Sequence, residues 1–288
     1  MMLDDAMREA KHQAFLASKK VRRAAERHAR RRFDVRHARL EEKHPFVYID
    51  GMFPHTFLNR PDPADAEQLD VPSTLWVVWI GDEPSPRRAE ALENLRRTPG
   101  VDVRLIASPD DVLVDGHPVH PAFSDLHAVH RSDYLRAYAM HHHGGAYLDV
   151  KPQSVAVQQL IDRVNSDETV WVLGYREVTS EYVGDLPHAL GAHLRAHFRA
   201  ALGTSAFICR PRSLFTAEWM RELHARLDYL QPRLREADFG QGNPYSAPAN
   251  YPIRWTEILG DITQPLSLKH QDHILFIDLI RPQLKDYR

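Results

Sequence analysis

Cysteine and long apolar runs are what this sequence has least of. A single cysteine, Cys209, in 288 residues cannot form a disulfide within the chain and is typical of a reducing compartment. The longest uninterrupted apolar run extends from Leu75 to Ile80, far short of the roughly 20 residues that a membrane-spanning helix needs. The first residues include Asp4 and Asp5 and form no apolar block of the kind found in secretory signals. We therefore expect a cytoplasmic protein.

Acidic residues are scarce in the first 40 residues, so that segment is basic and the rest of the chain is acidic. Residues 1–40 contain 12 Lys/Arg but only 5 Asp/Glu, a net charge of +7, so the rest carries −9 of the overall −2. A basic segment favours an anionic partner, and we expect peripheral contact of residues 1–40 with an anionic membrane surface. Few aromatic residues interleave with these charges, so nucleic acid is not an expected partner. The alternative is a helix with solvated charges that packs on the rest of the chain.

The composition is otherwise that of a globular protein, with 43% hydrophobic and 26% charged residues. Residues 4–40 lack Gly and Pro and are rich in Ala, Arg, Glu and Lys, which predicts one helix within a basic helical arm, residues 1–45. Five Gly or Pro residues then interrupt residues 46–72, which we interpret as an irregular linker. A single body domain is expected over residues 73–288.

Within this body, apolar strand patterns alternate with helical ones, which predicts an α/β fold built on parallel crossovers. The expected strands are residues 75–80, 101–106, 146–148, 169–173 and 205–209. The expected helices are residues 87–97, 125–143 and 214–229, with a further one near 255–259. Gly144-Gly145 ends the second helix with a left-handed turn.

Two predicted strands end in residues suited to binding chemistry, and ligands of open α/β sheets bind at the carboxyl ends of strands. Trp79 ends the first strand, and Asp149 and Lys151 follow Tyr147 at the end of another. Alternation along an extended chain places Asp149 and Lys151 on one side. Asp133 and Arg136, three residues apart on the preceding helix, point the same way. A carboxylate beside a guanidinium offers acceptors for hydroxyl groups and donors for phosphate oxygens.

The stretch His130-Arg131-Ser132-Asp133-Tyr134-Leu135-Arg136, followed by Gly144-Gly145-Ala146-Tyr147-Leu148-Asp149, resembles the sugar-nucleotide-binding region of the DXD-type glycosyltransferases. This group includes glycosyltransferase family 32, capsular polysaccharide synthesis transferases and the glucosylating domains of large clostridial toxins. Their pattern is S-D-x-x-R, a helix, then G-G-x-Y-x-D-x-D. The similarity covers residues 73–152 closely and the later chain more loosely.

The resemblance implies a GT-A fold, a Rossmann-like mixed sheet flanked by helices. It also implies a retaining glycosyltransferase that moves a sugar from a nucleotide diphosphate donor, a UDP-sugar, to a saccharide acceptor in surface polysaccharide synthesis. Mn²⁺ or Mg²⁺ usually bridges the diphosphate in this group. An oxidoreductase on a similar sheet is disfavoured because no G-x-G-x-x-G follows the first strand.

Carried over to this sequence, the resemblance assigns a role to each matching residue. Trp79 would stack on the nucleotide base, and Tyr147 would line the donor site. Asp133 and Arg136 would hold the donor sugar hydroxyls and position the diphosphate. Asp149 would be the first Asp of the DXD pair. Arg254 and Trp255, which lie where related enzymes close over the diphosphate, are expected to form a lid over the donor.

One departure from the family pattern leaves alternatives open, because Lys151 stands where the second Asp is expected. In the first hypothesis the Lys151 ammonium replaces the metal, and catalysis by Asp149, Lys151 and Arg136 is metal-independent. In the second, Lys151 turns away and Asp149 shares a metal with a ligand from late in the chain. The candidate late ligands are His270, Asp272 and His273. In the third, the protein binds a sugar nucleotide but is catalytically impaired.

Overall fold

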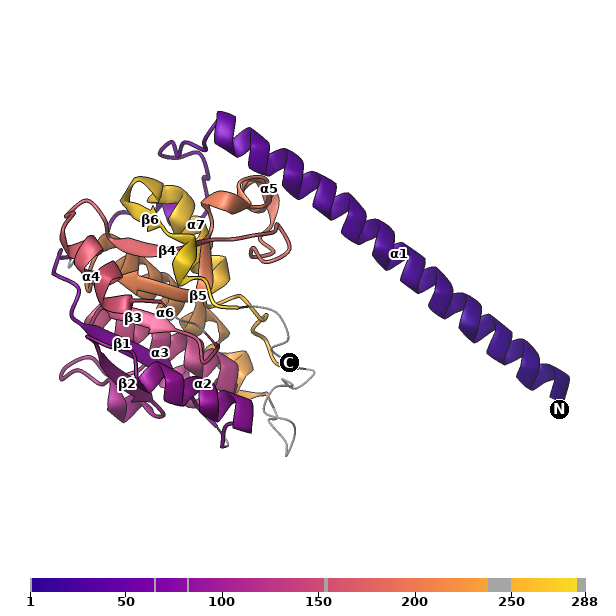
Figure 1. The fold of residues 1–288 in the computed structure, drawn as a ribbon, viewed down its shortest axis with the longest axis horizontal. Coiled ribbons are helices and arrows are strands. Elements are labelled where there is room, and N and C mark those ends of the chain that lie inside the picture. Colours follow the sequence, from indigo (N-terminus) through magenta and orange to yellow (C-terminus); the bar gives the residue numbers. More distant parts are fainter. Residues whose placement is uncertain (1, 65, 82, 153–154, 238–249, 284–288) are drawn as a thin grey trace.

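Six strands form one mixed sheet in the order β2-β1-β3-β5-β4-β6 (Figure 1). The computed structural model describes all residues except 1, 65, 82, 153–154, 238–249 and 284–288. The strands are β1 (Thr74–Val78), β2 (Asp102–Ile106), β3 (Gly145–Leu148), β4 (Val172–Arg176), β5 (Leu202–Cys209) and β6 (Ile274–Phe276). Helices flank this sheet, so the expected α/β class with a Rossmann-like mixed sheet is confirmed.

The direction of the strands defines the edge at which the candidate site lies. β1 pairs parallel with both β2 and β3, and β4 pairs parallel with β6. β5 runs antiparallel between β3 and β4. All strands except β5 therefore end at the same edge, which we call the carboxyl edge. Because β5 begins there, Ser205 lies beside Asp149, and the Asp149 amide donates to the Ser205 carbonyl over 2.9 Å.

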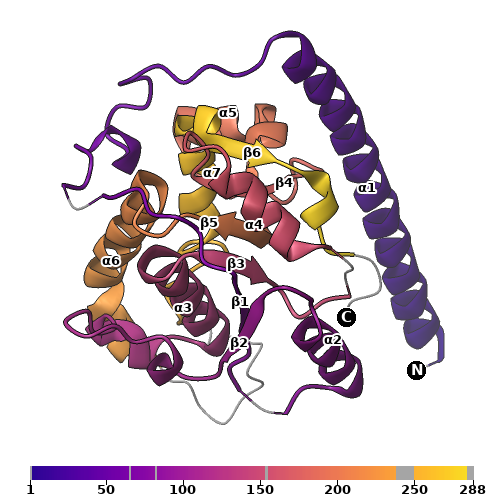
Figure 2. The same cartoon turned by 60° about the vertical axis from the view of Figure 1, so that its left-hand side comes forward.

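Helices cover both faces of the sheet (Figure 2). α2 (Pro86–Arg96) and α4 (Val157–Asn165) pack on one face, and α3 (Ala128–His142), α6 (Leu214–Arg235) and α7 (Gly260–Lys269) on the other. A short helix, α5 (His188–Ala196), contacts α7. Strand alternation divides the core accordingly: Leu75 and Val77 join the α2–α4 cluster, whereas Trp76 and Val78 join the α3 side.

Most predicted elements are present, with corrections at three places. β4 begins three residues later than expected, and β5 begins three residues earlier. The helix expected near residues 255–259 is wrong, because that segment consists of turns and the regular helix α7 begins at Gly260. α4, α5, α7 and β6 have no counterpart in the predicted elements. None of the helices in the described part of the chain is both long and apolar enough to cross a bilayer.

The N-terminal arm is the 42-residue helix α1 (Met2–Lys43), which extends well beyond the body in Figure 1. Residues 46–72 are largely irregular, as predicted, with one 3-10 turn at Phe57–Asn59. This segment nevertheless contributes Phe46, Phe53 and Leu58 to the core on the α3 side of the sheet. It is therefore packed against the body along much of its length.

Gly144 and Gly145 place β3 in the sheet. Their φ angles are +67° and +104°, in the region that favours glycine. A Cβ on Gly145 would lie 2.7 Å from the Thr74 carbonyl oxygen on β1. The close approach of β3 to β1 thus requires glycine, and the predicted turn at this pair is confirmed.

Candidate functional site

Arg136 lies at the centre of a cluster at the carboxyl edge, on the α3 side of the sheet. Its guanidinium carbon lies 4.2 Å from the centre of the Tyr147 ring. Arg136 Nη2 is 3.5 Å from Asp133 Oδ1 and 3.6 Å from Asp149 Oδ1. Arg136 Nη1 donates to the Thr204 carbonyl over 2.9 Å. The structure therefore brings the two predicted carboxylates to one guanidinium, although they come from a helix and a strand end.

Lys151 turns toward Asp149 through a tight turn, in which its amide donates to the Asp149 carbonyl over 2.7 Å, and not by the strand alternation that was expected. Its Nζ donates to Asp149 Oδ2 over 2.7 Å and to Ser205 Oγ over 3.0 Å. The Tyr147 hydroxyl donates to Asp149 Oδ1 over 2.6 Å. Burial raises the pKa of Tyr147 well above 10, so this hydroxyl keeps its proton and remains a donor. We call Asp133, Arg136, Tyr147, Asp149, Lys151 and Ser205 the site cluster.

The side chains of the site cluster differ in how much of their surface is exposed to solvent. The Asp133 and Arg136 side chains are 6% and 9% exposed, whereas Asp149 is 22% exposed. The Lys151 side chain, at 13%, lies between these values. Asp149 and Lys151 are therefore the members nearer to solvent, with Arg136 and Asp133 behind them.

The two carboxylates have opposite pKa shifts. Burial, together with the charge of Asp149, raises the pKa of Asp133 to about 7 despite the attraction of Arg136. Burial also opposes ionisation of Asp149, but the charges of Arg136 and Lys151 outweigh it and lower the Asp149 pKa. Asp149 is thus ionised at neutral pH, while Asp133 can gain or lose a proton there. Paired groups with separated pKa values are typical of sites that carry out acid–base or binding chemistry.

A divalent cation beside Asp149 does not fit the residues that surround it. Both carboxylate oxygens accept hydrogen bonds, one from the Tyr147 hydroxyl and one from the Lys151 ammonium. Mg²⁺ and Mn²⁺ prefer oxygen ligands, and a cation close to Asp149 Oδ2 would be repelled by the ammonium. In the described part of the chain, no group of three or more His, Cys, Asp or Glu residues could hold a metal ion.

The late residues predicted as metal ligands lie far from Asp149 in the sheet. The His273 ring stacks on Trp171, with 3.6 Å between ring centres, and both residues directly precede strands that run parallel to β3. They therefore lie at the edge opposite to the one where Asp149 follows β3. Asp272 is exposed beside His273, and His270 Nε2 donates to Glu218 over 2.7 Å. The hypothesis that Asp149 shares a metal with His270, Asp272 or His273 is wrong, because these three residues precede β6 at the edge of the sheet opposite to Asp149.

Trp79 follows β1 at the carboxyl edge, but its side chain packs with the α2–α4 cluster. The Arg88 guanidinium carbon of α2 lies 5.5 Å from its ring centre. The site cluster lies on the other face of the sheet. The structure therefore brings Trp79 to the predicted edge without joining it to Asp149, and base stacking by Trp79 stays a prediction.

The segment with Arg254 and Trp255 lies beside the first turns of α3. His130, three residues before Asp133, bonds the Tyr251 hydroxyl through Nδ1 over 2.9 Å and the Arg254 carbonyl through Nε2 over 3.2 Å. The Arg254 guanidinium itself pairs with Asp261 over 2.7 Å and donates to the Asp185 carbonyl. The Trp255 side chain is 67% exposed. This segment is thus near the site cluster, while the Arg254 charge is held by other partners.

Three residues escaped the sequence interpretation: Ser205 in the site cluster, and Tyr175 and Glu177 beside it. The Ser205 amide donates to the Tyr175 hydroxyl over 3.3 Å, next to the hydroxyl that Lys151 contacts. Glu177 follows β4 at the carboxyl edge and is 4% exposed, and burial raises its pKa to about 8. The rule that ligands bind at strand ends could have indicated Glu177 once β4 was correctly bounded. Nothing local pointed to Ser205, because it faces the site cluster only through antiparallel pairing.

Comparison with models of protein families finds no match for this chain, and neither does comparison with curated proteins. The chemistry of the site cluster therefore has to be argued from its own geometry.

Proposed function

We propose that this protein is a retaining glycosyltransferase of GT-A fold that transfers a sugar from a UDP-sugar to a saccharide acceptor in surface polysaccharide synthesis. The observation that carries the proposal is the convergence of Asp133, Asp149, Arg136 and Lys151 at the carboxyl edge. The six-stranded mixed sheet between helical layers supports the fold. The retention of configuration and the pathway rest on the resemblance of residues 130–149 to the DXD-type enzymes. We place the reaction in the cytoplasm.

The charges of the site cluster suit a sugar joined to a pyrophosphate. Carboxylates accept hydrogen bonds from sugar hydroxyls, and guanidinium and ammonium groups donate to phosphate oxygens. Arg136 Nε is buried and has no hydrogen-bond partner among the described residues. Transfer requires the nucleoside diphosphate to leave with its negative charge stabilised. Lys151, as the more exposed cation, is assigned to this role.

The metal-independent hypothesis is the form of the reaction that the site supports best. The Lys151 ammonium lies 2.7 Å from Asp149, where the family pattern has a second carboxylate. On binding, the diphosphate would take over this ammonium from Asp149, and Asp149 would then be available to a sugar or ribose hydroxyl. After this change of partner, the Lys151 ammonium is paired with the diphosphate and Asp149 keeps Arg136 beside it. The cost of desolvating these charges is therefore limited.

A second candidate function is sugar-nucleotide binding without turnover. The Asp149–Lys151 ion pair favours it, because a carboxylate already satisfied by an ammonium gains less from a substrate. The two functions predict the same ligand but different products. Slow release of UDP from a UDP-sugar in the presence of the pure protein would support the transferase, and saturable binding without release would support the second candidate.

The test combines a thermal-shift screen of nucleotide sugars with an assay of UDP release, each with EDTA and with Mn²⁺. We expect a UDP-sugar to raise the melting temperature saturably, and expect both signals to survive chelation. Lys151→Met should abolish both signals, whereas Arg97→Met, exposed just after the end of α2, should leave them unchanged. Strict Mn²⁺ dependence would overturn the role of Lys151, and no response to any nucleotide sugar would overturn the proposal itself.

A further inference from the structure

α1 contacts the body along one side of its C-terminal third. Asp34 accepts hydrogen bonds from Thr179 Oγ1 over 2.6 Å and from the Ser180 amide over 3.2 Å. Two turns later, Glu41 pairs with His197. Side chains described between residues 11 and 29 are all exposed. The helix is therefore fixed to the body on one side and open to solvent on the others.

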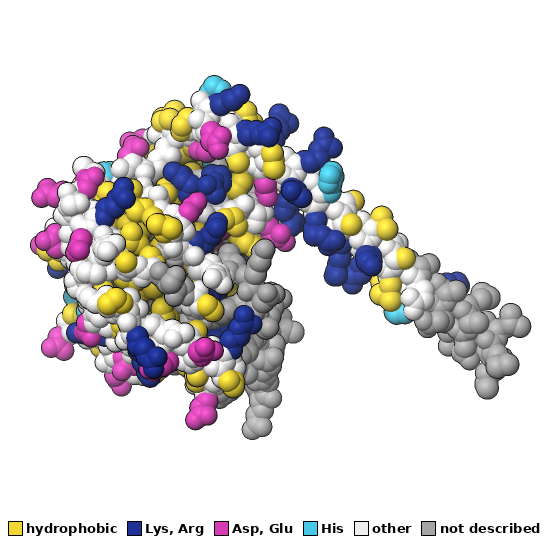
Figure 3. Space-filling model, in the orientation of Figure 1, with side chains coloured by type: hydrophobic (Ala, Val, Ile, Leu, Met, Phe, Trp, Pro, Cys, Tyr) yellow, Lys and Arg dark blue, Asp and Glu magenta, His cyan; other side chains and the backbone are white. Residues whose placement is uncertain are grey.

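Four cations line the opposite side of α1, and we call them the outer row. Successive residues of an α-helix are about 100° apart, so Arg36 and Lys43 lie about 200° and 180° around the axis from Asp34. The outer row consists of Arg32, Arg36, Arg39 and Lys43. All four are exposed, and among the described residues none of them forms a salt bridge. Figure 3 shows Lys and Arg side chains gathered along this helix.

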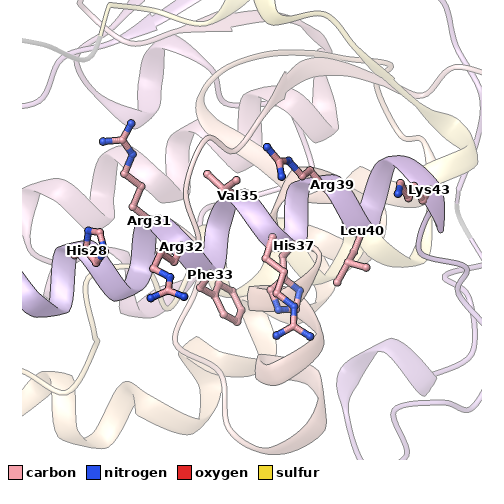
Figure 4. A pocket seen from close by; sticks show the side chains of 10 residues that line it. His28, Arg31, Arg32, Phe33, Val35, His37, Arg39, Leu40 and Lys43 are labelled. Carbon is pink, nitrogen blue, oxygen red and sulfur yellow. The ribbon is translucent and has the colours of Figure 1, made fainter.

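Exposed apolar side chains flank the outer row on both sides. Val35 is 46% exposed and projects from one side of the helix, while Phe33 and Leu40, 37% and 41% exposed, project from the other (Figure 4). Together with the outer row they border a hollow of 830 Å³ along the helix. Phe15 and Val21, 61% and 69% exposed, continue the apolar surface toward the N-terminus.

A cluster of Lys and Arg on a helix is attracted to anionic lipid head groups, and exposed apolar side chains beside it can add contact with the interfacial region. A nucleic acid would satisfy the cations but would leave Val35 and Leu40 in water. The cations alone would also fit the body of a second copy, since residues 41–288 carry −9. An anionic lipid surface is the partner that satisfies both the charges and the apolar groups.

We propose that the outer face of α1, made of the outer row with Phe33, Val35 and Leu40, docks on an anionic lipid surface. The cations contact lipid head groups, and the apolar side chains that flank them contact the interfacial region on either side of the row. The acidic body is repelled by the same surface and stays on the far side of the helix.

Docking on this face also orients the site cluster. Thr179 and Ser180, which bind Asp34, follow β4 by only a few residues at the carboxyl edge. α1 therefore packs near the edge that carries Asp149 and Lys151, and this edge faces the lipid surface when the outer row is bound. If the proposed function holds, the acceptor is a saccharide carried at the membrane surface.

The test measures co-sedimentation of the full chain with vesicles of phosphatidylcholine alone or mixed with phosphatidylglycerol. The outer-row variant replaces all four cations by Gln. Its matched control removes four exposed cations from the body: Arg96→Gln, Arg97→Gln, Arg233→Gln and Arg235→Gln. We expect the wild type and the control to bind only the anionic vesicles and the outer-row variant to bind at least about a hundredfold more weakly. Binding should also weaken in 1 M NaCl, since salt screens exposed charges.

A second variant, Phe33→Ser with Val35→Ser and Leu40→Ser, separates lipid from other anionic partners. It should lose vesicle binding while keeping any affinity for an RNA oligonucleotide. Equal vesicle binding by the wild type and the outer-row variant would overturn the proposal. The proposal would also be overturned if the wild type bound no vesicles but self-associated or bound RNA, and the outer-row variant lost that binding. UDP-sugar binding is measured separately as the test of the site cluster. If only the proposal for α1 fails, UDP-sugar binding is unchanged.

Discussion

Replacing Asp133 by Asn tests whether the carboxyl at the most buried end of the site cluster is held near its neutral form. The ordinary pKa of Asp, 3.8, rises to about 7 in the folded protein because Asp133 is buried beside Asp149. Asn has nearly the same shape and no charge. The substitution therefore removes the cost of ionising this position while preserving the packing around Arg136.

The sign and size of the effect follow from the two pKa values. Between about pH 4 and 7 the folded protein holds a proton that the unfolded chain has released, so stability falls as pH rises. The interval from 3.8 to about 7, at 1.36 kcal/mol per pH unit, corresponds to about 4 kcal/mol as an upper bound. Asp133→Asn should therefore change stability little at about pH 4 and raise it by up to about 4 kcal/mol at about pH 8.

Urea denaturation of the wild type and the variant across this pH range measures the difference directly. Asp149→Asn is the matched control, because the Asp149 pKa is lowered by Arg136 and Lys151 against the effect of burial. Its contribution is present above the ordinary pKa and is lost as pH falls, so Asp149→Asn should destabilise the protein at neutral pH. If Asp133→Asn lost the same stability at about pH 5 and pH 8, the Asp133 carboxylate would be ionised throughout, and the reasoning would be refuted.

Two further substitutions test the framework of the sheet, both by urea denaturation. Gly145→Ala should cost about 3 kcal/mol or more, because a Cβ would meet the Thr74 carbonyl at 2.7 Å. Gly116→Ala has a similar positive φ but an open surrounding, so it should cost only about 1–2 kcal/mol, and equal losses would contradict the contact argument. Arg210→Met should cost about 3–5 kcal/mol, because this guanidinium is 1% exposed and donates to four backbone carbonyls. Asp70→Ala, which removes its exposed partner, should cost under about 1 kcal/mol.

The features that the sequence alone determined depend on residues that are close together in the chain. The helical periodicity and the spacing of Asp133 and Arg136 placed both side chains on one side of α3. The Gly144-Gly145 pair marked the turn into β3, and the short separation of Asp149 and Lys151 in the chain kept them together after the end of that strand. The long Gly- and Pro-free stretch predicted α1 almost to its ends. Each of these depends on residues a few positions apart, where backbone geometry fixes the direction of a side chain.

The tertiary structure alone decided which distant segments meet. β5 enters the sheet antiparallel between β3 and β4, which brings Ser205 to Lys151 and moves His273 to the edge away from Asp149. Trp79 faces α2 and not the site cluster. Alternation along β1 shows which residues share a face, but which helices cover that face is decided only when the chain folds. Strand order, strand direction and the covered face depend on hydrophobic burial summed over the whole chain. A short stretch of residues therefore does not predict them.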